Sequence, residues 1–182
     1  MLNLIITNRE MSLFILINVI KMQSVTHFIF GVIIQKYIES LSLPLWIQIL
    51  LILFLGILSH IILDSIAVIT YHPTEPKNTF FWKAYHLLVL IASIAFIIIF
   101  IKYWLGMLAS SIPDIIDWYI LRPIYWKVTG KKDYSFSFFH KKIIDPTRNH
   151  LFFWLPNLTE KDWAVANELI IIVIGLIWMF SL

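Results

Sequence analysis

Two His and three Asp lie in otherwise apolar stretches of the chain, at spacings typical of one helix face. His60 and Asp64 are four residues apart. Asp114 and Asp117 are three residues apart, and His27 stands in a third apolar stretch. Side chains three or four residues apart project from the same face of a helix. The chain has no Cys, and His and carboxylate donors without thiolate suit Zn²⁺, Mn²⁺, Fe²⁺ or Mg²⁺. We therefore predict a divalent-metal site built from these five residues.

The three carboxylates need compensation wherever these stretches lie inside a membrane. An unpaired carboxylate in the hydrocarbon region costs about 2.5–3.5 kcal/mol on insertion scales. Residues 44–69 and 106–121, which hold the Asp, contain no Lys or Arg. Protons or a divalent cation remain, and the charge balance favours the cation. A bound metal would also lower the pKa of a coordinated water toward about 7 and polarise a phosphoryl or carbonyl oxygen.

Each of these residues also has a structural interpretation. His60 and Asp64 can form a hydrogen bond within one helix, and His27 can face lipid headgroups. Asp114 follows Pro113 and can be a first-turn residue favoured by the helix dipole. Three further His are second-tier candidates, because they lie in a polar turn or in a basic, aromatic segment: His72, His140 and His150.

The composition predicts an integral membrane protein that positions these residues on apolar helices. Of 182 residues, 60% are hydrophobic and 14% are charged, and the mean hydropathy is +0.84; soluble domains carry about 25% charged residues. Crossing a bilayer takes about 20 apolar residues. We therefore predict one all-α membrane domain over residues 1–182, a bundle of about five transmembrane or membrane-embedded helices at 24–39, 44–69, 84–104, 106–121 and 166–182. His and Asp interrupt 24–39 and 106–121, which either cross the membrane or are re-entrant.

The polar segment 122–165 predicts a loop at the membrane surface, with a short amphipathic piece near 149–155. Its first part, 122–148, holds seven basic and two acidic residues, so the positive-inside rule places the loop in the cytoplasm. Threading the helices from this loop brings the predicted ligands toward the cytoplasmic ends of their helices. The small net charge of +3 gives no reason to expect a nucleic-acid partner.

The N-terminal segment 1–21 is not predicted to span. Its apolar run of about nine residues is too short to cross a bilayer, and no small-residue cleavage site follows it. A secretory signal is therefore not expected, and Met11 and Met22 are alternative starts of translation.

Three short motifs resemble the bacterial and archaeal membrane-bound metal-dependent hydrolase family. THFIFG (26–31), SHIILD (59–64) and PDIID (113–117) are similar to its Thr-His-x-x-x-Gly, Ser-His-x-x-x-Asp and Pro-Asp-x-x-Asp elements. The resemblance covers roughly residues 22–120. It implies a multi-helix inner-membrane domain that binds a divalent metal, with hydrolysis of a phosphoester or lipid-like substrate. Carried over position by position, its site residues are His27, His60, Asp64, Asp114 and Asp117.

The order of the motifs departs from the family pattern. In better-known members, a Pro-Asp-x-Asp-His element and then a His-Arg-x-x-Thr-His element precede the Ser-His-x-x-x-Asp helix. Here PDIIDW follows that helix, has an extra spacer and ends in Trp118. The segment HKKIIDPTRNH (140–150) is similar to a stretched form of the second element, with His140 and His150 in its His positions.

Our leading functional hypothesis is a metal-dependent hydrolase that acts on a phosphoester- or ester-containing amphiphile from the inner leaflet. In this hypothesis His60, Asp64 and Asp114 bind the metal, and His27 is a ligand or an orienting partner. Asp117 is a general base or a bridging ligand. Four Lys of the polar segment steer an anionic headgroup toward the site: Lys131, Lys132, Lys141 and Lys142. The alternatives are an ion- or proton-coupled transporter and a non-enzymatic membrane scaffold.

Overall fold

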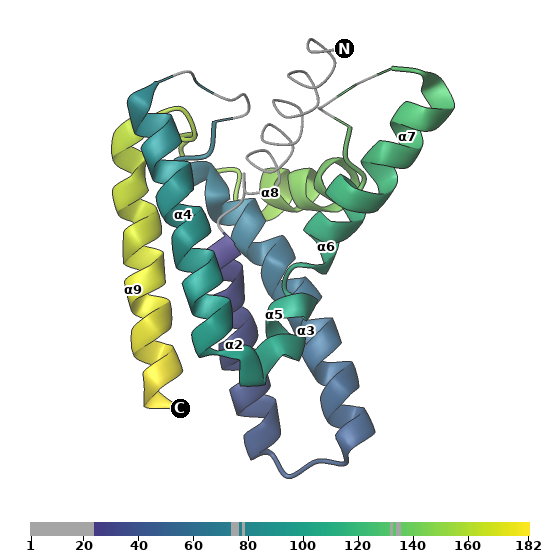
Figure 1. Cartoon of the computed structure of the whole chain (residues 1–182), viewed down its shortest axis with the longest axis vertical. Helices are drawn as coiled ribbons and strands as arrows, with labels where there is room; N and C mark the ends of the chain where they lie inside the picture. The colour runs from purple at the N-terminus through teal and green to yellow at the C-terminus, as the bar shows by residue number, and fades with distance from the viewer. Residues whose placement is uncertain (1–23, 74–76, 78, 132, 134–135) are drawn as a thin grey trace, which may run out of the picture.

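A computed structural model of the chain describes residues 24–73, 77, 79–131, 133 and 136–182. The N-terminal segment, with the alternative starts Met11 and Met22, lies outside the described residues. Across the described ranges the chain is helical and forms no strand. Its α-helices are α2 (Ser24–Ser40), α3 (Leu45–Ile66), α4 (Phe80–Ile99), α5 (Trp104–Ala109), α6 (Ile112–Asp114), α7 (Arg122–Thr129), α8 (Asp145–Leu151) and α9 (Val165–Ser181) (Figure 1). Two π-helical segments, Ile115–Leu121 and His140–Ile144, join α6 to α7 and lead into α8.

Three helical segments in the described part of the chain are long and apolar enough to cross a membrane. They are Leu45–Ile69, Phe80–Ile99 and Asp162–Ser181. Many of their Leu and Ile side chains are exposed, among them Leu88 and Ile174, as expected for surfaces that face lipid. The fold is therefore all-helical and compatible with a membrane protein, whereas the count of about five embedded helices stays a prediction.

The helix α2 lies at the centre of the bundle although it is shorter than these three spans. It packs against α3, α4, α5 and α9 (Figure 1). Its polar side chains His27 and Gln35 are buried together with Gly31, which confirms that the polar stripe faces the protein. A central position suits α2, because lipid would leave these polar groups without partners.

Small residues let the helices around α2 approach closely. A Cβ atom at Gly31 would lie only 2.3 Å from the carbonyl oxygen of Gly106 in α5. One at Gly56 of α3 would lie 2.5 Å from the Cβ of Ala109. Both contacts join a helix that carries His ligand candidates to α5. The glycines therefore fix how α2 and α3 sit against the segment that leads to Asp114.

The predicted helix 106–121 is interrupted in the structure. The helix α5 ends at Ala109, and a new helix starts at Ile112 and continues through the π-helical segment and α7 to Thr129. The hydroxyls of Ser110 and Ser111 both donate to the carbonyl of Met107, at 3.0 and 2.9 Å. Such bonds compete with the backbone ladder, and Pro113 is favoured in the first turn of the next helix. The break is therefore set by local sequence.

The segment 122–165, predicted as a surface loop, contains α7 and the helix formed by His140–Ile144 and α8. The helix α8 packs against α3 and runs across it (Figure 1). Ile144 is fully buried and anchors this helix. Charge and three Pro suggest a loop, but Pro123 and Pro146 each follow a π-helical segment within a continuous helix. Pro and π-helical turns distort a helix without necessarily ending it. The predicted amphipathic piece at 149–155 overlaps only the end of α8.

The remaining boundaries lie close to the predicted ones. The prediction of 84–104 begins four residues late, because α4 starts at Phe80. There the Thr79 hydroxyl accepts a hydrogen bond from the Trp82 N–H at 3.2 Å and caps the helix. The α-helix also ends earlier, at Ile99, and a short 3₁₀ turn leads to α5.

Candidate metal centre

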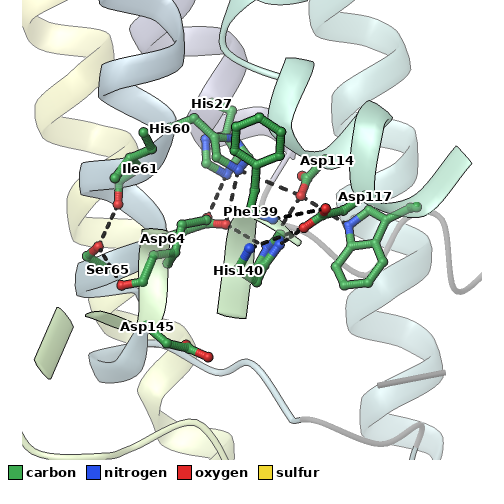
Figure 2. A network of polar contacts seen from close by, with 12 residues as sticks. His27, His60, Ile61, Asp64, Ser65, Asp114, Asp117, Phe139, His140 and Asp145 are labelled. Atoms are coloured by element: carbon green, nitrogen blue, oxygen red, sulfur yellow. Dashed lines mark hydrogen bonds and ion pairs between the residues drawn. The ribbon is translucent and has the colours of Figure 1, made fainter. Parts of the chain in front are cut away.

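Four side chains from separate parts of the chain converge beside α2. His60 and Asp64 come from α3, Asp114 from α6, and His140 from the π-helical turn before α8. Each offers one ligand atom, and these atoms all lie within 4.8 Å of one another. We call these four residues the His/Asp cluster. Figure 2 shows the four side chains pointing toward one another, with His27 of α2 stacked on His60 at a ring distance of 4.2 Å.

The carboxylate of Asp64 lies between three imidazoles. Its Oδ1 is 3.0 Å from Nε2 of His27, and its Oδ2 is 3.2 Å from Nε2 of His60 and 3.1 Å from Nε2 of His140. The Asp114 Oδ1 is farther away, at 3.7 Å from Nε2 of His60 and 3.6 Å from Nε2 of His140. The inner part of the site is buried, since Asp64 is only 3% exposed and His60 is fully buried.

Most of the converging atoms have no hydrogen-bond partner despite these short distances; the exception is Asp114 Oδ1, which accepts a hydrogen bond from Nε1 of Trp118 at 3.0 Å. Both Asp64 oxygens and the Nε2 atoms of His27, His60 and His140 are buried without a partner. A buried polar atom left unsatisfied costs about 1–3 kcal/mol, and more if it is charged. A cation in the His/Asp cluster could satisfy the His60, Asp64 and His140 atoms together. The arrangement is therefore one that can hold a metal ion.

The break between α5 and α6 orients His60. A helix end leaves backbone carbonyls without intrahelical partners, and the Ser110 carbonyl accepts a hydrogen bond from Nδ1 of His60 at 2.8 Å. This bond fixes the tautomer with the proton on Nδ1. Nε2 then faces the His/Asp cluster, an outer-shell arrangement usual for metal-ligating His.

Asp117 orients His140 in a similar way. Its Oδ2 accepts a hydrogen bond from Nδ1 of His140 at 2.8 Å. The carboxylate also accepts from the backbone N–H groups of Phe138, Phe139 and His140, at 2.8, 3.0 and 3.1 Å. Both side chains lie in π-helical segments, which are frequent at functional sites. Asp117 therefore orients His140 and caps the turn that carries it.

This contact also sets the charges of the two groups. Burial opposes ionisation of Asp117, but the hydrogen bonds from His140 and from the backbone N–H groups outweigh it and lower the pKa of Asp117. Burial likewise opposes a proton on His140, yet its hydrogen bond to Asp117 and the nearby carboxylates of Asp64 and Asp114 raise its pKa above the ordinary value of 6.5. A cation that binds Nε2 of His140 therefore has to displace a proton.

Two cavities border the His/Asp cluster. One has a volume of about 380 Å³ and is mostly apolar, with His27 and Asp114 on its wall next to Phe28 and Leu90. The other, of about 230 Å³, is lined mainly by polar residues and includes Asp64 and His140. Its other lining residues are Ala67, Val68, His72, Asp145, Arg148, Asn157 and Thr159. The cluster is therefore reachable from an apolar side and from a polar side.

The structure brings four of the five predicted ligands together and places the fifth just behind them. His27, His60, Asp64 and Asp114 meet, and the proposed roles of Asp117 as a ligand or a general base stay predictions. Among the second-tier residues, His140 joins the His/Asp cluster. His72 lines the polar cavity, and His150 is exposed on α8.

Sequence reasoning missed Arg148 and Glu168. Arg148 was counted only as a topology charge, yet its Nη2 donates to the backbone carbonyl of Asp64 at 3.2 Å. The resemblance of residues 140–150 to a family element is the sequence feature that points to this region as part of the site. Glu168 is buried in α9 and accepts a hydrogen bond from the Tyr85 hydroxyl.

The His/Asp cluster can hold a divalent metal ion by the type, number and convergence of its donors. Its two imidazoles and two carboxylates leave the identity of the metal among Zn²⁺, Mn²⁺, Fe²⁺ and Mg²⁺. Comparisons with protein-family models, with curated proteins and with solved structures found no match for the chain.

Proposed function

We propose that the His/Asp cluster is the metal centre of a membrane-bound hydrolase that acts on a phosphoester- or ester-containing amphiphile. The observation that carries the proposal is the set of buried donor atoms that converge without hydrogen bonds: Nε2 of His27, His60 and His140 and both oxygens of Asp64. A divalent cation held there would supply a Lewis acid for attack of water on a phosphoryl or carbonyl group. The motif resemblance to membrane-bound metal-dependent hydrolases points in the same direction.

The residues of the chain then have distinct tasks. His60, Asp64, Asp114 and His140 hold the cation, and the stacked His27 supplies a further donor on the Oδ1 side of Asp64. Asp117 keeps His140 in place.

Hydrolysis also needs a group that accepts the proton of the attacking water. Asp114 lines the apolar cavity and Asp64 lines the polar one, whereas Asp117 lines neither. Asp114 has the more accessible side chain of the two, at 14% against 4%. We therefore assign proton transfer to Asp114 in this proposal, in place of the role first expected for Asp117.

The location of the site is part of the proposal. The excess of basic residues in 122–148 favours a cytoplasmic position for this segment. His140 belongs to the same segment, so the centre faces the cytoplasmic leaflet of the cell membrane. A substrate with an apolar chain can then reach it from the bilayer.

Elemental analysis of the detergent-purified, full-length protein tests the metal. We expect about one divalent ion per chain, lost in the double variant His60→Ala, Asp64→Ala and retained in His150→Ala, whose side chain is exposed and away from the cluster. Absence of stoichiometric metal after incubation with each of the four ions would refute the centre.

A hydrolysis assay on the same samples tests the reaction. Metal-loaded protein should release product from a phosphoester or carboxylic-ester amphiphile, and a chelator should stop it. Metal-dependent ion flux in proteoliposomes without hydrolysis would support the transporter instead. Metal without turnover or flux would support the scaffold.

A further inference from the structure

The two cavities beside the His/Asp cluster differ in chemistry and share no lining residue. The apolar cavity reaches the cluster at His27 and Asp114, and the polar cavity reaches it at Asp64 and His140. A molecule that occupied both would pass over the cluster. Such a molecule needs an apolar part and a polar part on either side of its reacting bond.

The apolar cavity suits an alkyl chain. Its volume of about 380 Å³ lies within the ~300–1,000 Å³ range of small-molecule sites. Leu90 and Ile97 on its wall belong to α4, which is one of the spans able to cross a membrane. Lipid chains next to α4 therefore have a short route into the cavity.

The polar cavity contains one Arg side chain, Arg148, beside the carboxylates of Asp64 and Asp145. The guanidinium of Arg148 is held by two contacts: Nη2 donates to the carbonyl of Asp64 at 3.2 Å, and Nη1 is 3.3 Å from Oδ1 of Asp145. Its Nε is buried without a partner. A guanidinium has five N–H donors in a planar fork that matches phosphate oxygens. Arg148 thus retains donors for a ligand next to the backbone of Asp64.

Asn157 adds a second donor to this cavity. Its Oδ1 accepts from the N–H and the hydroxyl of Thr159, at 3.2 and 2.8 Å. The side-chain oxygen is occupied, so the amide N–H groups are what Asn157 offers to a ligand. Together, Arg148 and Asn157 line the polar cavity with donors suited to anionic oxygens.

We infer, on the basis of the proposed function, that the substrate is a lipid with a phosphate-containing headgroup. Its alkyl chain lies in the apolar cavity, its phosphate is drawn toward Arg148 and Asn157, and the phosphoester lies over the His/Asp cluster. The oxygen of water forms a bond to phosphorus while the P–O bond to the leaving group breaks. The proton of water passes through a cavity-facing carboxylate to the leaving oxygen, so no oxidant or further reactant is needed.

Binding measurements on metal-loaded, full-length protein test this inference without relying on turnover. The probes are a short-chain phosphatidic acid and inorganic phosphate, each titrated by calorimetry in detergent. Arg148→Gln should weaken binding of both probes by about tenfold or more, because a hydrogen bond to a charged group is lost. Asn157→Ala should weaken both to a smaller extent and serves if Arg148→Gln fails to fold. Lys127→Gln removes an exposed charge in α7, outside the cavity, and should change neither.

The chain-binding side is tested by filling the apolar cavity. Leu90→Trp should weaken binding of the lipid by about tenfold and leave binding of inorganic phosphate unchanged. Leu87→Trp makes the same change on the exposed side of α4, outside this cavity, and should change neither. If the lipid and inorganic phosphate each bind Leu90→Trp as tightly as they bind the wild-type protein, the substrate is a soluble phosphate and the inference is wrong.

Metal content measured on the same samples separates failure of the substrate inference from failure of the proposed function. Stoichiometric metal with no preference for the lipid overturns the substrate inference alone. Lack of metal in wild-type protein overturns the proposed function. Lipid binding that is unaffected by both Arg148→Gln and Leu90→Trp also overturns the inference, because the lipid then lies elsewhere.

Discussion

Asp64 and Glu168 are both buried carboxylates in helices able to cross a membrane, yet their surroundings differ. Each is 3% exposed. Glu168 accepts a hydrogen bond from the Tyr85 hydroxyl beside an apolar cavity of about 500 Å³. Both Asp64 oxygens lack a hydrogen-bond partner and face three imidazole nitrogens. Burial alone therefore does not identify a ligand site. The convergence of donor atoms around Asp64 is what makes it part of a candidate metal site.

The largest expected effect comes from removing a ligand of the His/Asp cluster. His60→Ala should reduce the affinity for the bound divalent metal by more than the roughly 10–100-fold that loss of an outer-shell partner costs. The side chain is fully buried, and its Nε2 lies 3.2 Å from Asp64. Competition with a chromophoric chelator measures the affinity. Unchanged affinity in a folded His60→Ala protein would remove His60 from the ligand set.

Loss of the outer-shell carboxylate should have a smaller effect. Asp117→Asn keeps the shape but weakens the orientation of His140, so metal affinity should fall by about 10–100-fold. In Co²⁺-loaded protein, the visible spectrum should shift because His140 is held less firmly. A purely structural role would lower thermal stability without moving the spectrum of the protein that remains folded.

Overpacking between α2 and α5 tests whether the close approach of these two helices positions the residues of the His/Asp cluster. Gly31→Ala places a Cβ 2.3 Å from the backbone oxygen of Gly106. The backbone has to move, so we expect a loss of about 1–3 kcal/mol in the free energy of unfolding together with weaker metal binding. Gly175→Ala is the matched control, because its Cβ would meet a side-chain methyl of Ile29 at 2.8 Å and so overpacks α2 against α9 instead of against α5. Equal effects of the two variants on metal binding would contradict this account.

The smallest effect is expected at the other carboxylate. Glu168→Gln keeps an acceptor for the Tyr85 hydroxyl and should change the free energy of unfolding by about 1 kcal/mol or less. Metal affinity should stay at the wild-type value. A marked loss of metal in Glu168→Gln would mean that this pair is coupled to the His/Asp cluster and that the two carboxylates are not functionally separate.

Helical spacing predicted much of the site because several of its residues lie one turn apart in the same helix. His60 and Asp64 share a face of α3, and His27 shares a buried face of α2 with Gly31. These relations depend only on local geometry, which periodicity reports. The inward position of the polar stripes followed from the cost of exposing them to lipid.

The remaining residues of the site are placed by contacts between segments that are distant in the sequence. His140 and Arg148 reach Asp64 because the helix ending in α8 packs against α3. Charge and Pro content had suggested a loop there, so no spacing rule could bring them to the site. The break at Ser110, which aims the carbonyl at His60, likewise lay inside a segment predicted as one helix. The role of Asp117 needed the backbone of residues 138–140 to be placed.

X-ray absorption spectroscopy of the metal-loaded, full-length protein tests the central claim most directly. With Zn²⁺, we expect a first shell of nitrogen and oxygen at about 2.0–2.2 Å, with outer-shell scattering from at least two imidazoles. Replacement of His60 and His140 by Ala should remove that imidazole scattering, whereas His150→Ala should leave it unchanged. A shell of oxygen alone in wild-type protein would contradict a metal centre at the His/Asp cluster.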